Sequence, residues 1–398
     1  MPSPNPFTPG AGSVPPALVG REPVTETFVT LLDRVRSSRP HQGILLTGLR
    51  GVGKTVLLSE WLNDAERVGA RTIFIEASDT GAFLPALAHQ VRKSLVKMRP
   101  GKAIATAVEH ALRVVKSFSL TLGHEGPKFG VEIDPAEGFA DTGDPELDMT
   151  DLFVALGEAA QERDEPIVFI IDEMQYLDKV ELGSLIAAFH RTVQKRFPIL
   201  VVGGGLPNLR ALAGEAKTYS ERLFHFAPLG ALTQGEVAEA IQGPAIANKA
   251  RFTDRALEAI YNATNGYPYF VQEWAYDSWN LASTTTTIDV EVVNRASAQV
   301  ITRLDNGFFQ VRLERLTDKE LLYLRAMAEG GPDVQRSGAI AERYGQSVQR
   351  VGPIRDAMIK RGLIYSPARG ETAFSVPLFD GFMRRKHPDL DELRRQAL

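Results

Sequence analysis

The sequence contains no cysteine among its 398 residues, so disulfides and thiolate metal or nucleophile chemistry are excluded. Its seven histidines are scattered, without the i, i+4 pair typical of a helical metal site. No apolar run approaches the length needed to cross a bilayer, so a membrane partner is not expected. The net charge of −4 excludes a wholly basic nucleic-acid-binding protein, and any such surface must be local. We therefore expect a cytoplasmic protein of two or three domains.

Residues 1–16 are rich in proline, glycine and serine, and have neither a charged start nor an apolar core. This composition excludes a secretory signal. It predicts a disordered tail, with a clamp on the folded part of the chain as the alternative.

The most informative stretch is Gly43–Leu62, where a glycine-rich loop joins a short apolar strand to an amphipathic helix. Its residues fit the pattern G-x-x-x-x-G-K-[ST] from Gly48 to Thr55. Glycines without a Cβ allow a loop to curl around a phosphate and to direct backbone N–H groups at it, and the start of the following helix adds its dipole. Lys54 can reach the β- and γ-phosphates of a nucleotide, and the Thr55 hydroxyl can bind Mg²⁺.

This loop predicts a site for ATP and Mg²⁺, and an ordinary glycine turn is the alternative. The predicted nucleotide-binding positions are Gly48, Arg50, Gly51, Val52, Gly53, Lys54, Thr55 and Val56.

A second strand over Arg71–Ala77 and a helix over Phe83–Met98 complete a βαβ crossover, which predicts a parallel sheet. Further along, an apolar run indicates a strand buried on both faces, with Asp172 and Glu173 at the carboxyl end where such sheets bind ligands. Asp172 would bind Mg²⁺ through its water shell, and Glu173 would polarise an attacking water. A strand that ends in an acidic helix cap is the alternative.

Between these elements, Phe118–Leu122 and Phe129–Ile133 alternate apolar and polar residues around a Gly/Pro turn. The alternation predicts a β-hairpin insertion over about residues 117–134, acting as a contact surface or a flap. The acidic segment Asp134–Asp148 is predicted to be an exposed loop.

After residue 231 the pattern changes to helices only, which predicts a helical lid domain over 232–310 behind a nucleotide-binding domain over 17–231. Residues 311–398 have the order helix, helix-turn-helix, hairpin that is typical of a winged helix. Six basic residues against two acidic ones between Arg336 and Arg361 are a modest excess that would allow contact with duplex DNA. A protein-contact or autoinhibitory module is the alternative. The predicted DNA-contacting residues are Arg350, Arg355, Lys360 and Arg361 on the second helix and Arg369 on the wing, with Arg384, Arg385 and Lys386 as further phosphate contacts or a solvated surface.

Two further segments resemble nucleotide-contacting motifs of AAA+ and STAND-type ATPases. Val19-Gly20-Arg21-Glu22, just ahead of the loop, resembles their adenine-side motif, which implies that the backbone near Val19 and Gly20 holds the base. Gly266-Tyr267-Pro268 resembles the motif in which a proline, here Pro268, lies against the base. A helix-entry turn and an ordinary helix start are the respective alternatives.

The same resemblance implies a role for Arg222, which matches the arginine-finger position of the AAA+ arrangement. There it would stabilise transition-state charge on the nucleotide of a neighbouring subunit in a homo-oligomer. A surface ion pair with Glu221 or Glu215 is the alternative. Where AAA+ enzymes end a strand with a polar residue that senses the γ-phosphate, this chain has glycine, with Asn208 nearby, which implies slow hydrolysis.

Taken together, residues from about 17 to 385 resemble an AAA/STAND-type P-loop ATPase of the archaeal and replication-initiator-like kind. The resemblance implies an α/β fold, a P-loop NTPase sheet between helices, followed by a helical lid and a C-terminal winged helix. The leading hypothesis is an ATP-binding switch with slow Mg²⁺-dependent hydrolysis, with Lys54, Asp172, Glu173 and Arg222 as catalytic residues. An ATP-gated DNA-binding regulator and a protein-interaction scaffold with structural ATP are the alternatives.

Overall fold

The computed structural model describes residues 4–10, 12–79, 81–98, 106–123, 134–282 and 286–397. The chain forms two compact units. The first, here called the sheet unit, comprises Glu22–Thr47 and Lys54–Pro228. The second, here called the helical unit, comprises Met1–Arg21, Gly48–Gly53 and Leu229–Leu398. The glycine-rich loop thus packs with the helical unit, although the predicted domain over 17–231 contains it.

The sheet unit is built on five parallel strands in the order β2-β3-β4-β1-β5. The strands are β1 (Gly43–Thr47), β2 (Arg71–Glu76), β3 (Ile167–Asp172), β4 (Ile199–Gly205) and β5 (Phe224–Pro228). Every residue of β1, β3 and β4 is buried, as expected for apolar runs in a parallel sheet. Val202 pairs with Ile170 on one side and with Ile44 on the other, so the carboxyl ends of these strands lie at one edge.

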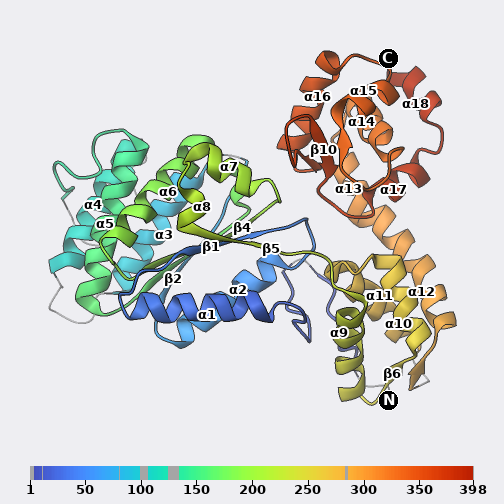
Figure 1. Cartoon of the computed structure of the whole chain (residues 1–398), viewed down its shortest axis with the longest axis horizontal. Coiled ribbons are helices and arrows are strands. Elements are labelled where there is room, and N and C mark those ends of the chain that lie inside the picture. The colour runs from blue at the N-terminus through green and yellow to red at the C-terminus, as the bar shows by residue number, and fades with distance from the viewer. Residues whose placement is uncertain are drawn as a thin grey trace. The chain divides into compact units, whose positions relative to one another are not determined.

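Helices cover both faces of this sheet (Figure 1). On one face lie α1 (Glu22–Arg36) and α2 (Lys54–Arg67), where the rings of Phe28 and Trp61 stack with centroids 4.6 Å apart. The helices on the other face are α3 (Phe83–Lys97), α4 (Thr106–Thr121), α5 (Pro145–Arg163) and α6 (Lys179–Gln194), followed by the short α7 (Leu209–Ala216) and α8 (Ser220–Leu223). On that face Phe153 stacks on Phe169 at 4.7 Å. The predicted sheet between helices is confirmed.

The predicted β-hairpin differs from the structure in its first strand, because α4 continues as a helix to Thr121. Val108, Ala111, Val115 and Phe118 are buried at helical spacing, so the apolar face of this helix extends into the segment predicted as strand. Over so few residues, the apolar positions of a helix can resemble the alternation of a strand, and this happened in the last turn of α4. The second predicted strand, 129–133, lies outside the described residues.

The acidic segment before α5 forms a loop that is largely exposed over residues 134–144, as predicted, and its turn into α5 is held by hydrogen bonds. Asp148 is only 2% exposed, and its carboxylate accepts hydrogen bonds from the backbone N–H groups of Thr142 and Gly143, both at 3.0 Å. Asp144 caps α5 by accepting from Glu146 N at 2.8 Å. These carboxylates are therefore structural acceptors for the turn that leads into α5.

The helical unit begins with the four predicted lid helices, α9 (Gln234–Ala247), α10 (Asp254–Thr264), α11 (Pro268–Leu281) and α12 (Val290–Arg303). Thr253 and Asp289 are N-caps of α10 and α12, as predicted. Two strands of two residues each, β6 (Arg251–Phe252) and β7 (Thr287–Ile288), pair in parallel, which the all-helical prediction missed. Strands this short carry no readable alternation.

A π-helical turn η2 (Leu304–Phe309) and α13 (Gln310–Leu313) lead into the C-terminal module, here residues 314–397. Its elements are α14 (Asp318–Ala328), β8 (Gln335–Arg336), α15 (Ser337–Tyr344), α16 (Val348–Lys360), β9 (Ile364–Tyr365), β10 (Glu371–Phe374), α17 (Phe379–Lys386) and α18 (Leu390–Ala397). The three strands are antiparallel in the order β8-β10-β9.

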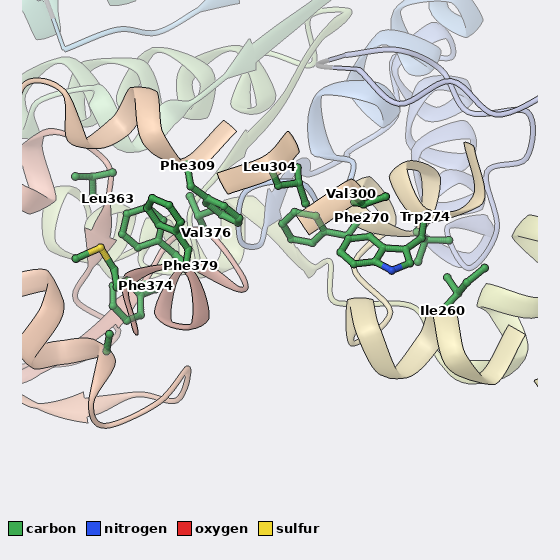
Figure 2. Packing of buried hydrophobic residues seen from close by; sticks show 14 of the residues in the cluster. Ile260, Phe270, Trp274, Val300, Leu304, Phe309, Leu363, Phe374, Val376 and Phe379 are labelled. Carbon is green, nitrogen blue, oxygen red and sulfur yellow. The ribbon is translucent and has the colours of Figure 1, made fainter. Parts of the chain in front are cut away.

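The lid helices and the C-terminal module share one hydrophobic core, which Figure 2 shows running from Ile260 and Trp274 to Phe374. Phe309 stands between the two ends, with its ring 6.4 Å from that of Phe270 and 5.1 Å from that of Phe382. The predicted boundary at residue 310 is therefore not a boundary of packing.

The N-terminal segment is not a disordered tail where the structure describes it. Phe7 is 1% exposed, with its ring 6.1 Å from Phe252 and 6.0 Å from Trp279, both edge-on. Asn5 donates to Tyr276 O at 2.9 Å. The Phe7 ring and the Asn5 hydrogen bond fix a segment whose Pro/Gly composition gives it no structure of its own. Among the described residues, no helix is long and apolar enough to cross a membrane.

Candidate functional site

The glycine-rich loop needs its glycines for two different reasons. Gly51 and Gly53 have φ of 83° and 93°, in the left-handed region that residues with a Cβ rarely adopt. A Cβ on Gly48 would lie 2.4 Å from Leu229 O, so this position is required by close approach of another backbone. The loop conformation thus depends on Gly48 and Gly53, which the motif specifies, and also on Gly51, which lies at one of its unspecified positions.

Lys54 and Thr55 open α2 directly after this loop. Within the sheet unit, the Thr55 hydroxyl donates to Asp172 Oδ2 at 2.5 Å, and Lys54 is close enough to Asp172 to favour its ionised form. The structure therefore brings together three of the predicted site residues: Lys54 and Thr55, which follow the glycine-rich loop, and Asp172, which follows the apolar run of β3. Val56 follows in the first turn of α2 and is half-buried.

Asp172 is a buried carboxyl group, 2% exposed, at the end of β3. Burial raises its pKa, while the Thr55 hydroxyl, the Glu173 N–H at 2.8 Å and Lys54 act in the opposite direction, and the raising effect prevails. A hydroxyl and a buried carboxylate whose oxygens lie 2.5 Å apart form a donor set that fits Mg²⁺, which prefers oxygen ligands and keeps several waters.

Glu173 begins a 3₁₀ turn (Met174–Tyr176) with φ of 54° and ψ of 37°, a left-handed conformation that is uncommon for a residue with a side chain. Its carboxylate accepts a hydrogen bond from Gln175 Nε2. Gln175 in turn accepts from the backbone N–H of Leu206 at 3.0 Å. Sequence reasoning did not single out Gln175, because its partners are known only once the end of β4 is in place.

Gly204, near the end of β4, lies close to the Asp172 carboxylate. A Cβ on Gly204 would lie 3.0 Å from Asp172 Oδ1 and 3.6 Å from Lys54 Cβ. Asn208 lies at the N-cap position of α7 without a capping bond, and its side-chain oxygen finds no hydrogen-bond partner among the residues that the structure describes. Whether Asn208, the polar residue nearest in sequence, acts as a γ-phosphate sensor in place of the glycine stays a prediction.

Within the helical unit, the loop is hydrogen-bonded to three separate segments. Arg21 donates from Nη2 to Val52 O at 3.1 Å and to Gly230 O at 2.8 Å. Tyr269 N donates to Gly51 O at 3.2 Å. Arg50 N donates to Ser375 O of the C-terminal module at 3.0 Å, so this N–H, predicted to face phosphate, has a protein acceptor here.

The two segments predicted to hold the base also lie in the helical unit. Gly20 has φ of 72°, and a Cβ there would lie 2.4 Å from Glu236 Oε1, so it packs tightly against the start of α9. Val19 is buried in the shared core. Pro268 is half-buried in the first turn of α11, beside Tyr269 whose N–H contacts the loop. Base contact by these residues stays a prediction.

Arg222 in α8 is exposed, and its carbonyl accepts from Gln42 Nε2 at 2.8 Å. Glu221, the alternative ion-pair partner, lies 3.9 Å from Arg210 instead. An exposed arginine on this helix is compatible with a role on another subunit, which stays a prediction.

The basic residues of the C-terminal module divide into two groups. Arg355 donates to Thr372 Oγ1 at 3.1 Å and to Ser366 Oγ at 2.8 Å, which fastens α16 to the hairpin. Arg361 lies 3.5 Å from Glu320. Arg355 thus stabilises the module, whereas Arg361 is exposed, as are Arg336, Arg350, Lys360 and Arg369. Arg384 and Arg385 form ion pairs with Asp380 at 2.7 Å and Asp305 at 2.6 Å.

A parallel sheet in the order β2-β3-β4-β1-β5, a glycine-rich loop after β1 and an Asp-Glu pair after β3 define the P-loop NTPase fold. More specifically, residues 17–202 match the family described as "AAA ATPase domain". Residues 306–383 match a family described as "Domain of unknown function (DUF8462)". The resemblance to AAA-type ATPases predicted from the sequence is confirmed for this domain.

Several solved structures are similar to the chain over most of its length. A Walker-type ATPase of Pyrococcus abyssi matches 92% of this chain and 96% of its own, with 14% identity and a TM-score of 0.56. Cdc6p from Pyrobaculum aerophilum covers 98% and 97%, with 16% identity and a TM-score of 0.47. The Orc1 protein of Aeropyrum pernix in complex with DNA covers 96% of each chain, with 16% identity and a TM-score of 0.47. Comparison with curated proteins gives no match.

Proposed function

We propose that the protein is an ATP-binding switch with slow Mg²⁺-dependent ATP hydrolysis, coupled to a winged-helix module at its C-terminus. The observation that carries the proposal is the set of hydrogen bonds on the loop. Val52 accepts from Arg21, Gly51 from the lid residue Tyr269, and Arg50 donates to Ser375 of the C-terminal module. A loop in contact with both the lid and the C-terminal module can transmit the presence of a nucleotide to them.

The chemistry assigned to the sheet unit is attack of water on the γ-phosphorus. Lys54 would bind the β- and γ-phosphates, and Thr55 and Asp172 would hold Mg²⁺, which neutralises phosphate charge. Glu173 would accept a hydrogen bond from the attacking water and take its proton as the water oxygen bonds to phosphorus and the bond from phosphorus to the ADP oxygen breaks. Glycine in place of a polar residue at the end of β4 supports a slow rate.

The C-terminal module supports the winged-helix assignment through its element order. Helix α14, strand β8, helices α15 and α16 and the hairpin of β9 and β10 follow one another, and β10 pairs with both other strands. Ser375, whose carbonyl accepts from the loop, comes directly after β10. A change in the loop on nucleotide binding would thus reach the C-terminal module directly beside its wing.

An ATP-gated DNA-binding regulator is the second candidate, favoured by the exposed Arg336, Arg350, Lys360 and Arg369. Four exposed basic residues can neutralise a few phosphates, so duplex binding would weaken measurably with salt. A protein-interaction scaffold predicts retained partner binding without affinity for duplex DNA. In a homo-oligomer, Arg222 would act on the neighbouring nucleotide.

The deciding experiment measures ATP binding and turnover, with and without duplex DNA, for the wild type, Lys54→Ala and Glu173→Gln. The switch predicts tight binding that is lost in Lys54→Ala, and slow turnover that is lost in Glu173→Gln while binding is retained. Turnover stimulated several-fold by DNA would favour a DNA-coupled ATPase. Absence of ATP binding in the wild type would refute the proposal.

A further inference from the structure

A polar side chain occupies the space between Glu173 and the end of β4, although β4 itself ends in glycine. Gln175 donates from Nε2 to the Glu173 carboxylate and accepts at Oε1 from Leu206 N at 3.0 Å. All three residues belong to the sheet unit.

The orientation of this amide is fixed by its partners. An ionised carboxylate can only accept hydrogen bonds, and a backbone N–H can only donate one. Rotating the Gln175 amide by half a turn would set oxygen against oxygen at Glu173 and nitrogen against nitrogen at Leu206. The bridge therefore determines which end of the amide faces the Glu173 carboxylate.

Glycine at the end of β4 provides the room for this bridge. A Cβ on Gly205 would lie 3.0 Å from Gln175 Oε1 and 2.8 Å from Leu209 Cδ2, closer than a side chain is normally accommodated. A side chain at this position would therefore crowd the Gln175 amide, and glycine leaves room for the bridge. The glycine that departs from the AAA+ pattern is accounted for by a neighbour that takes up its space.

We propose that Gln175 is a positioning residue for Glu173, which holds the carboxylate in one rotamer and links it to the turn between β4 and α7. The proposal rests on the hydrolytic role given to Glu173 above. In this role Gln175 would contact Glu173 and not the nucleotide. It acts by fixing where the carboxylate points, and the left-handed backbone of Glu173 leaves the side chain without the restraint of a regular helix.

Two substitutions with side chains of similar length separate the effect of the Gln175 hydrogen-bond donor from the effect of a side chain that merely fills the space. Gln175→Met fills the space without hydrogen bonds, and kcat should fall about 10-fold while KM and the Kd of ATP stay within about twofold. Gln175→Glu keeps an acceptor for Leu206 but sets a second carboxylate against Glu173, and kcat should fall about 100-fold. Gln194→Met, at the exposed end of α6, is the matched control and should retain wild-type kcat.

An unchanged kcat in Gln175→Met would overturn the proposal, as would a loss of ATP binding in parallel with kcat, which indicates a structural role only. A double-mutant cycle decides the matter independently of turnover. The denaturant midpoints of Gln175→Met, Glu173→Ala and the double variant should be non-additive, with the double shift smaller than the sum of the single shifts. Additive shifts would refute the bridge. A wild type that binds ATP without turnover would remove the hydrolytic function, and the cycle would still test the bridge.

Discussion

Replacing Arg21 tests whether the nucleotide loop is held in its conformation from outside its own motif. Arg21 is half-buried and donates from one nitrogen to Val52 O at 3.1 Å and to Gly230 O at 2.8 Å. A hydrogen bond from a charged donor contributes about 1.5–3 kcal/mol when buried, and partial exposure reduces this to about 1 kcal/mol each. Arg21→Met keeps the apolar stem and removes both bonds, for a total of roughly 2 kcal/mol, together with the longer bond of 3.2 Å from Nη1 to the adjacent Gly20 O.

If these bonds hold the loop in its binding conformation, their loss leaves the loop less preorganised for the nucleotide. A cost of about 2 kcal/mol raises the Kd of Mg·ATP by about 30-fold, and half that cost by about fivefold. Isothermal titration calorimetry measures the Kd, and thermal unfolding without nucleotide checks that the variant is folded. Arg34→Met is the control, because it removes an exposed arginine-to-carbonyl bond of 2.7 Å to Pro40 that the loop does not use. A Kd within twofold of wild type in folded Arg21→Met would refute the reasoning.

Three further predictions concern stability and the metal site. Phe7→Ala removes an aromatic ring that is 1% exposed and should lower the free energy of unfolding by about 3 kcal/mol in denaturant titrations, whereas a freely moving tail would give no change. Because burial raises the pKa of Asp172, its contribution to stability is fully present below the ordinary carboxyl pKa and is lost as pH rises through the raised value. Asp172→Asn should therefore raise the nucleotide-free melting temperature at neutral pH and abolish stabilisation by Mg·ATP, and an equal or lower melting temperature would contradict this. Gly204→Ala places a Cβ 3.0 Å from the Asp172 carboxylate and should weaken Mg·ATP binding about 10-fold by calorimetry, whereas Gly183→Ala, whose nearest neighbour would be 3.7 Å away, should bind as wild type.

The sheet and the centre of the site could be predicted because their signals are local. The apolar run that ends at Asp172 and the loop that ends at Thr55 each lie within about a dozen residues, and parallel pairing brings their carboxyl ends together. The hydrogen bond between Thr55 and Asp172 joins residues 117 positions apart, yet the glycine-rich loop and the Asp-Glu strand together predict that these two residues lie close to each other. Such contacts follow from fold rules rather than from particular side chains.

The partners of the loop could not be predicted in the same way. Arg21 contacts Gly230, 209 positions away, and no periodicity or motif links the two. Phe7 is buried by aromatic residues of the lid, although the composition around it indicated a tail. Apolar and polar residues also alternate in the sequence of the last turn of α4, so only the packing of this segment decides between helix and strand. These errors share one cause, since a tertiary contact overrides a local pattern that is short or weak.

The aromatic residues of the helical unit show how a loop without a side chain at its tip can act on a module distant in sequence. A Cβ on Gly51 would lie 3.2 Å from Tyr269 Cβ, so the loop and the start of α11 are in close contact. Tyr269 stacks on Phe308 with centroids 5.1 Å apart, and Phe309 stacks on Phe382 of the C-terminal module at 5.1 Å. Phe308 and Phe309 are adjacent residues, and adjacent residues of a regular helix point about 100° apart. Here both lie in the π-helical turn η2, a feature that often marks functional positions. Close packing makes such a chain of rings stiff rather than continuously deformable, so a displacement at the loop is expected to shift the rings together. This stiffness supports a switch whose output lies in the C-terminal module.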